Sequence, residues 1–117
     1  MIAEPAGRLR PAELRRDFDL SRERMARLID VSAKTIERWE ERDGLPDRTS
    51  GRIRLEFARL QEIRTLGLMV YTPEGFRLFL QTPLEELGGR TSLQAIEQGD
   101  AELVIAALAA DYEGLGF

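Results

Sequence analysis

Four polar side chains of one short predicted helix have the types and spacing needed to contact a nucleic acid duplex. They share the outer face of a helix expected between Ser32 and Gly44: Lys34, Thr35, Arg38 and Arg42. Cationic and hydroxyl side chains supply the donors that contact phosphates and base edges in a DNA groove. Ser32 precedes this helix as its N-cap, and Arg52 follows it in an arginine-rich stretch. The pattern predicts a DNA-reading helix, with Ser32 and Arg52 as further DNA contacts.

This helix is the second of a predicted helix-turn-helix over residues 20–46. Ser21 is a good N-cap for the first helix, and Asp30 lies in the tight connection between the two. Ile36 and Trp39 form the inner stripe of the second helix, which Gly44 is expected to stop. Two ordinary helices of a bundle give the same amphipathic pattern, and the arginines are then only a solvated face.

A more specific signal is the run Val-Ser-x-x-Thr-Ile-x-Arg-Trp-Glu at residues 31–40. It resembles the second half of the helix-turn-helix units of the Xre group, which are similar to phage repressors. Asp30 stands where many such units carry glycine, and aspartate tolerates the left-handed backbone that this turn requires.

The remaining helix start and stop signals predict helices throughout the chain. A helix over 11–18 comes first, and a long amphipathic one over 52–66 follows the helix-turn-helix. Thr-Pro pairs at 72–73 and 82–83 are start signals, Thr91 with Gln94 is a capping box, and Asp100 is expected to cap the last helix, to about Tyr112. Residues 66–72 fit either a strand or a helix end. We therefore predict an all-α fold: an N-terminal helix-turn-helix bundle over residues 1–66 and a small helical domain over 67–117.

Composition excludes several functions. The chain has 117 residues, 43% of them hydrophobic and 32% charged, as in a soluble globular protein. It contains no cysteine and no histidine, which removes thiol chemistry, most zinc sites and imidazole bases. Neither a glycine-rich phosphate loop nor an apolar leader or membrane span is recognisable. We expect a cytoplasmic protein that is not an enzyme, holds no metal or other cofactor and does not enter a membrane.

The charges are segregated along the chain. Residues 1–66 carry 15 basic and 13 acidic side chains, a balance of +2, whereas residues 67–117 carry 2 and 8, a balance of −6. A balance of +2 gives one copy little attraction for phosphate, so it should bind DNA weakly. We therefore expect a homodimer that spans two half-sites of an operator.

Motifs of the second half follow one another in a recognisable order. They are Phe-x-x-Phe-Leu-x-Thr-Pro from residue 76, Leu-Gly-Gly-Arg-Thr at 87–91, and Tyr-Glu-Gly-Leu-Gly-Phe at 112–117. This order resembles the toxin-binding domain of the Xre/MbcA/ParS antitoxins, which follows an Xre-like helix-turn-helix, and the resemblance spans about residues 14–117. It departs from the family where a proline usually follows the Gly-Arg-Thr and where a tryptophan often replaces Phe79.

The resemblance implies an antitoxin that neutralises a RES-domain toxin, an enzyme that consumes NAD, and that represses its own operon. By analogy the last helix and tail enter the active-site cleft of the toxin. The toxin-binding residues would then be Arg90, Asp111, Tyr112, Glu113, Leu115 and Phe117. For Arg90 a capping or salt-bridging role fits the sequence equally well, and Phe76 and Phe79 are expected in the core.

A second function remains open at this point. The run TIERWEERDGLPDRTSGRIR at 35–54 also resembles the helix-turn-helix and wing of MerR or excisionase regulators, which implies a stand-alone transcription regulator without a toxin. That group usually continues into an aromatic wing residue or a long coiled coil. Here several short capped helices follow instead, so the antitoxin reading is preferred.

Overall fold

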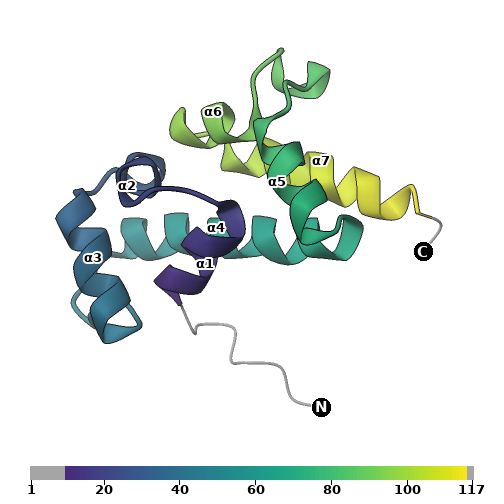
Figure 1. Cartoon of the computed structure of the whole chain (residues 1–117). Helices are drawn as coiled ribbons and strands as arrows, with labels where there is room; N and C mark the ends of the chain where they lie inside the picture. The colour runs from purple at the N-terminus through teal and green to yellow at the C-terminus, as the bar shows by residue number, and fades with distance from the viewer. Residues whose placement is uncertain (1–9, 116–117) are drawn as a thin grey trace.

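A computed structural model describes residues 10–115 of the chain, and these residues form α-helices and one 3₁₀-helix without any strand (Figure 1). The all-α prediction is confirmed. In chain order the elements are α1 (Pro11–Phe18), α2 (Arg22–Ile29), α3 (Ala33–Arg42), α4 (Gly51–Val70), α5 (Pro73–Gln81), the 3₁₀-helix η1 (Glu85–Leu87), α6 (Ser92–Glu97) and α7 (Ala101–Glu113).

Hydroxyl caps start most of the helices where the sequence predicted them. The side chain of Ser21 accepts a hydrogen bond from the amide of Arg24, and Ser32 does the same for Thr35, each at 3.1 Å. Thr91 and Gln94 form the full capping box that opens α6. These bonds satisfy amides that have no partner inside their helix, so they fix the first residue of each element.

Three aspartates end the first three helices in the left-handed conformation. Asp19, Asp30 and Asp43 have φ values of 58°, 62° and 56°. Asp30 thus makes the turn between α2 and α3 in place of the usual glycine, as expected. The stop of α3 differs by one residue from the prediction, because Asp43 rather than Gly44 takes the left-handed cap.

The helix α4 is longer than the sequence predicted. It contains 20 residues and continues past residue 66 to Val70, so residues 66–72 are a helix end and not a strand. The expected boundary between residues 66 and 67 lies inside this helix. α7 runs alongside α4 (Figure 1), and Arg59 of α4 pairs with Glu102 of α7.

One hydrophobic core joins the two halves of the chain. Phe18 of α1 meets Phe76 of α5 edge to face, with 5.4 Å between ring centroids, and Trp39 of α3 meets Phe57 of α4 in the same way at 5.9 Å. Phe76 and Phe79 are both buried, as predicted. The helix-turn-helix therefore packs on elements from the second half.

One start signal in the second half was misread, and a second marks its helix start correctly but without a capping bond. Thr82 begins no helix: it ends α5, and its hydroxyl donates to the carbonyl of Leu78 at 2.6 Å. The next helix is η1, which begins at Glu85. Leu84 precedes it, and no side chain caps its start. Asp100 stands at the start of α7 but makes no capping bond, because its carboxylate accepts a hydrogen bond from Arg90.

Candidate DNA-binding and partner-binding sites

The outer face of α3 presents the expected cationic side chains to solvent. Lys34, Arg38 and Arg42 are exposed and Thr35 is half-buried. Lys34 forms an ion pair with Glu37 at 3.0 Å, which lowers the pKa of that carboxyl. Among residues 10–115, Arg38 and Arg42 have no hydrogen-bond or ion-pair partner. Their guanidinium groups therefore remain available for phosphates or base edges.

Ser32 holds the start of this face in place. Its hydroxyl lies 2.9 Å from that of Thr35, in addition to the capping bond to the Thr35 amide. The predicted contact of Ser32 with DNA is thus combined with a structural role at the N-terminus of α3.

A carboxylate on the opposite side of α3 fixes the helix against its neighbours. Glu40 is only 6% exposed and accepts hydrogen bonds from Arg15 of α1 at 3.1 Å and from Arg22 of α2 at 3.0 Å. Burial alone would raise the pKa of Glu40, but the two guanidinium groups outweigh it and hold the pKa below its ordinary value. The bond to Glu40 likewise raises the pKa of Arg15. We call Glu40 with Arg15 and Arg22 the Glu40 clamp. The clamp fixes the orientation of α3.

A second cationic group lies at the start of α4, at the same end of the molecule as α3 (Figure 1). Ser50 caps this helix at 3.2 Å, and Arg52 is exposed in its first turn. Arg48 is exposed in the preceding loop, and sequence reasoning had not selected it. Within the described part of the chain neither arginine forms an ion pair. Free arginines beside a capped helix N-terminus favour phosphate.

At the other end of the molecule, the expected partner-binding residues have different surroundings. The hydroxyl of Tyr71, which follows α4, donates to the carboxylate of Asp111 on α7 at 3.0 Å. Tyr71 also stacks on Phe79 with 5.3 Å between ring centroids. Burial and the bond to Asp111 raise the pKa of Tyr71 to about 12. Asp111 therefore ties the end of α7 to the end of α4.

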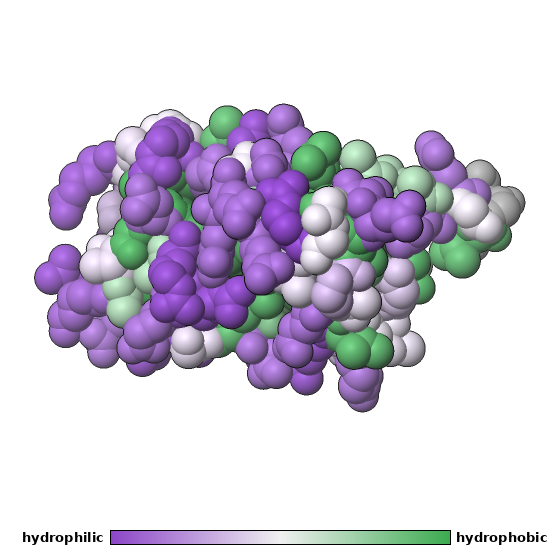
Figure 2. Space-filling model, turned by 90° about the horizontal axis from the view of Figure 1, so that it is seen from above, coloured by the Kyte–Doolittle hydropathy of each residue, from purple (hydrophilic) through white to green (hydrophobic). Residues whose placement is uncertain are grey.

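The last described residues are more open. Glu113 is exposed, Leu115 is 51% exposed, and Tyr112 is half-buried and engaged within the molecule. Phe117 lies outside the described residues. Seen from the side of α5 and α6, hydrophobic and intermediate residues gather toward this end, whereas the surface over the helix-turn-helix is largely hydrophilic (Figure 2).

Arg90 is engaged by its own turn. Its guanidinium donates to the carbonyl of Leu87, to the side chain of Gln98 and to Asp100, all at 2.8 Å. These bonds join η1 to the segment between α6 and α7. They correspond to the capping or salt-bridging role that also fits the sequence at Arg90. Contact of Arg90 with a partner stays a prediction.

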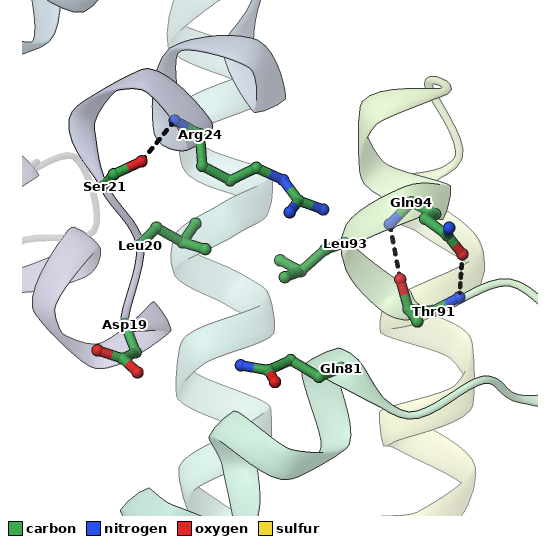
Figure 3. Close-up of a pocket in the computed structure, with 8 residues that line it drawn as sticks. All are labelled: Asp19, Leu20, Ser21, Arg24, Gln81, Thr91, Leu93 and Gln94. Carbon is green, nitrogen blue, oxygen red and sulfur yellow. Dashed lines mark hydrogen bonds between the residues drawn. The ribbon is translucent and has the colours of Figure 1, made fainter.

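A cavity of about 520 Å³ opens between the two halves (Figure 3). Its lining residues are Asp19, Leu20, Ser21, Arg24, Gln81, Thr91, Leu93 and Gln94. Several of its polar groups are already committed, because Ser21, Thr91 and Gln94 make capping bonds and Arg24 pairs with Glu97 at 2.6 Å. The cavity therefore offers few free polar groups to a ligand.

An apolar groove lies beside the Tyr71–Asp111 bond. It encloses about 270 Å³ and is lined by Tyr71, Gly75, Leu78, Phe79, Thr82 and Leu84. Leu78 projects from it with 69% of its surface exposed. The groove adds apolar surface to the end of the molecule where α7 finishes.

Between residues 10 and 115 no three acidic, cysteine or histidine side chains gather as a metal would require. In the same range no helix is both long and apolar enough to cross a membrane.

Comparison with solved structures finds a chain of similar architecture. No family model and no curated protein matches the sequence. One matching chain comes from the crystal structure of the M. tuberculosis MbcT–MbcA toxin–antitoxin complex. The match has a TM-score of 0.67, covers 97% of each chain and has 19% sequence identity. The two chains share one fold. The likeness includes the helix-turn-helix and the second half together, in agreement with the family resemblance of the sequence motifs.

Proposed function

We propose that this chain is an antitoxin that binds DNA through α3 and a toxin through the end of α7. The observation that carries the proposal is the full-length fold shared with a chain of a toxin–antitoxin complex. A match confined to residues 20–46 would point only to DNA binding, since helix-turn-helix units occur in many regulators. Coverage of 97% extends the likeness to the second half, where the toxin-binding motifs lie.

The DNA-binding part of the proposal is supported by the free cations of one surface. Arg38 and Arg42 on α3, with Arg48 and Arg52 around the start of α4, are exposed cations at one end of the molecule. In this proposal α3 enters the major groove of an operator, and Arg52 contacts phosphate. The protein represses its own operon in the cytoplasm, and it binds the operator as a homodimer.

The toxin-binding part is supported by the opposite end. Glu113 and Leu115 are exposed beyond the Tyr71–Asp111 bond, which fixes the direction in which α7 leaves the core. In this proposal the segment from Tyr112 to Phe117 occupies the NAD cleft of a RES-domain toxin. Inhibition then needs only occupancy, and the chain has no catalytic role and no cofactor.

Two variants separate the two activities. Deletion of residues 113–117 should leave operator binding intact and abolish inhibition of NAD consumption by the co-purified toxin. Arg38→Ala is the matched control: it should weaken operator binding and leave inhibition of the toxin intact. Equal inhibition by the full-length and truncated chains would place neutralisation elsewhere and contradict the tail mechanism.

The alternative is a stand-alone regulator without a toxin partner. The exposed arginines of α3 suit this function equally well, but the residues after α3 do not form the strands of a wing: from 43 to 50 the chain makes a loop and then enters α4. Failure of a neighbouring RES-domain protein to bind the folded chain, together with specific operator binding, would establish this alternative.

A further inference from the structure

The central helix α4 carries apolar side chains on two opposite faces. Phe57, Leu60 and Ile63 are fully buried in the core. On the opposite side, Leu55 and Met69 are 51% and 52% exposed. A helix that packs on one side only usually has charged residues on the other, and a helix that is apolar all round is usually covered. The outer side of α4 therefore has the character of an interface.

The exposed residues of this side follow the spacing of a helix-packing surface. They occur alternately three and four positions apart, and all are exposed: Leu55, Ala58, Glu62, Thr65 and Met69. We call this stripe the α4 seam. Alternate spacing of this kind keeps one line of side chains facing a second helix. The stripe contains a single charge, that of Glu62.

Two charges at or beside the α4 seam form no ion pair within the described residues. In the part of the chain that the structure describes, Glu62 makes neither a hydrogen bond nor an ion pair. Arg54, at the margin of the seam, contacts only the backbone carbonyl of Pro46. The two residues lie eight positions apart, about 12 Å along the helix axis, so they are too distant to pair with each other. Ala58 stands midway between them.

We propose that the α4 seam is the interface of a homodimer, in which two copies of α4 cross in antiparallel fashion at Ala58. A two-fold axis beside Ala58 brings Arg54 of each copy against Glu62 of the other, so the charges are self-complementary. The small side chain of Ala58 allows close approach of the two helices at the crossing point. This arrangement supplies the interface for the proposed homodimer, and it requires neither a toxin nor an operator.

The size of the seam sets the strength of the dimer. A helix of 20 residues is about 30 Å long and about 10 Å wide, so each copy contributes roughly 300 Å². A stable complex usually buries about 800 Å² per partner. The dimer should therefore be reversible in the micromolar range and should form more completely on an operator with two half-sites.

Sedimentation velocity of the full chain, without DNA or toxin, tests the proposal. Glu62→Arg and Arg54→Glu should each weaken dimerisation by at least about tenfold, because each places like charges at two contacts. The double variant Arg54→Glu/Glu62→Arg reverses both pairs and should restore the dimer. No intramolecular contact explains such a rescue, since the two side chains are too far apart within one copy. Circular dichroism of each variant reports whether it is folded.

The control is Leu78→Asp, which removes an exposed leucine from the apolar groove beside the Tyr71–Asp111 bond and should leave the dimer unchanged. A monomer at every concentration, or single variants with unaltered dimerisation, would overturn the proposal. Loss of the dimer in Leu78→Asp alone would assign the interface to the groove. Dimerisation that appears only after deletion of residues 1–9 would show that this segment, and not a second copy, covers the α4 seam in the full chain. Each of these outcomes leaves toxin inhibition to be judged separately by the tail deletion.

Discussion

Glu40 divides the arginines around α3 into two groups. Arg15 and Arg22 are bound to its carboxylate and orient the helix, whereas Arg38 and Arg42 are exposed and make no hydrogen bond or ion pair among residues 10–115. The same residue type thus has a structural role on one side of α3 and is free to bind on the other. The distinction decides which arginine variants should affect DNA and which should affect folding.

Arg38→Ala should weaken binding to the specific operator by about 1–3 kcal/mol, because a guanidinium that contacts a base edge contributes that much discrimination. Arg52→Ala should instead weaken binding to all DNA sequences about equally, since a phosphate contact carries no sequence information. Electrophoretic mobility shifts at fixed salt, with specific and unrelated duplexes, measure both. Unchanged operator affinity in a folded Arg38→Ala chain would remove α3 from the DNA interface.

Glu40→Gln should lower the free energy of unfolding by about 1–3 kcal/mol at neutral pH, because the charge-assisted hydrogen bonds from Arg15 and Arg22 are weakened. The folded-state pKa of Glu40 lies below its ordinary value of 4.5. Its contribution is therefore present in full above pH 4.5 and is lost as the pH falls through the folded-state value. Urea unfolding of both chains across this range should show the stability difference shrinking toward acid. A difference independent of pH would contradict the Glu40 clamp.

Sequence patterns predicted the residues whose partners are local. Ser21, Ser32 and Thr91 each bond to the amide three positions ahead, so their roles can be read from the chain alone. The Glu40 clamp joins residues 25 and 18 positions apart, and no periodicity predicts which arginine will reach it. The bond between Asp111 and Tyr71 spans 40 positions, so no local pattern predicts it either.

At the scale of the elements, α4 shows where tertiary packing overrides local signals. Gly67 lowers helix propensity, and it lies in the stretch 66–72 that fits either a strand or a helix end by sequence. In the structure Gly67 is buried inside α4, directly against the ring of Phe76. The missing side chain at Gly67 lets α5 pack closely on α4, and this packing compensates for the poor helix propensity of glycine.

Gly67→Ala tests this packing. A Cβ at residue 67 would lie 2.3 Å from ring atoms of Phe76, so the ring must move within the core. We expect a net loss of about 1–3 kcal/mol from overpacking, despite the better helix propensity of alanine. Gly51→Ala at the start of the same helix is the control, because nothing lies within 4 Å of its Cβ. It should be neutral or slightly stabilising in thermal melts. Equal stability of the two variants would contradict the close approach of α5.

At the scale of the whole molecule, α4 connects two ends with different roles. The free arginines lie around α3 and the start of α4, and the exposed tail lies where α7 finishes (Figure 1). The core between them is continuous, because Phe18 of the first half packs on Phe76 of the second. Two predicted segments therefore share one fold, although their charges and motifs are distinct.

This shared core predicts that the first half does not fold alone. A chain ending at residue 70 keeps α1 to α4 entire but loses α5 and α7, which pack against α4. Two core residues of α4, Leu60 and Ile63, are 1% and 0% exposed in the full chain, and the ring of Phe76 that contacts Phe18 is lost as well. Re-exposing each such side chain costs about 1.5–3 kcal/mol, and a domain has only about 5–15 kcal/mol in total. Circular dichroism should therefore show little cooperative unfolding for residues 1–70, and operator binding should be lost with it. Deletion of residues 113–117 is the control and should melt like the full chain. A cooperative, DNA-binding fragment 1–70 would instead show that the helix-turn-helix is an independent domain.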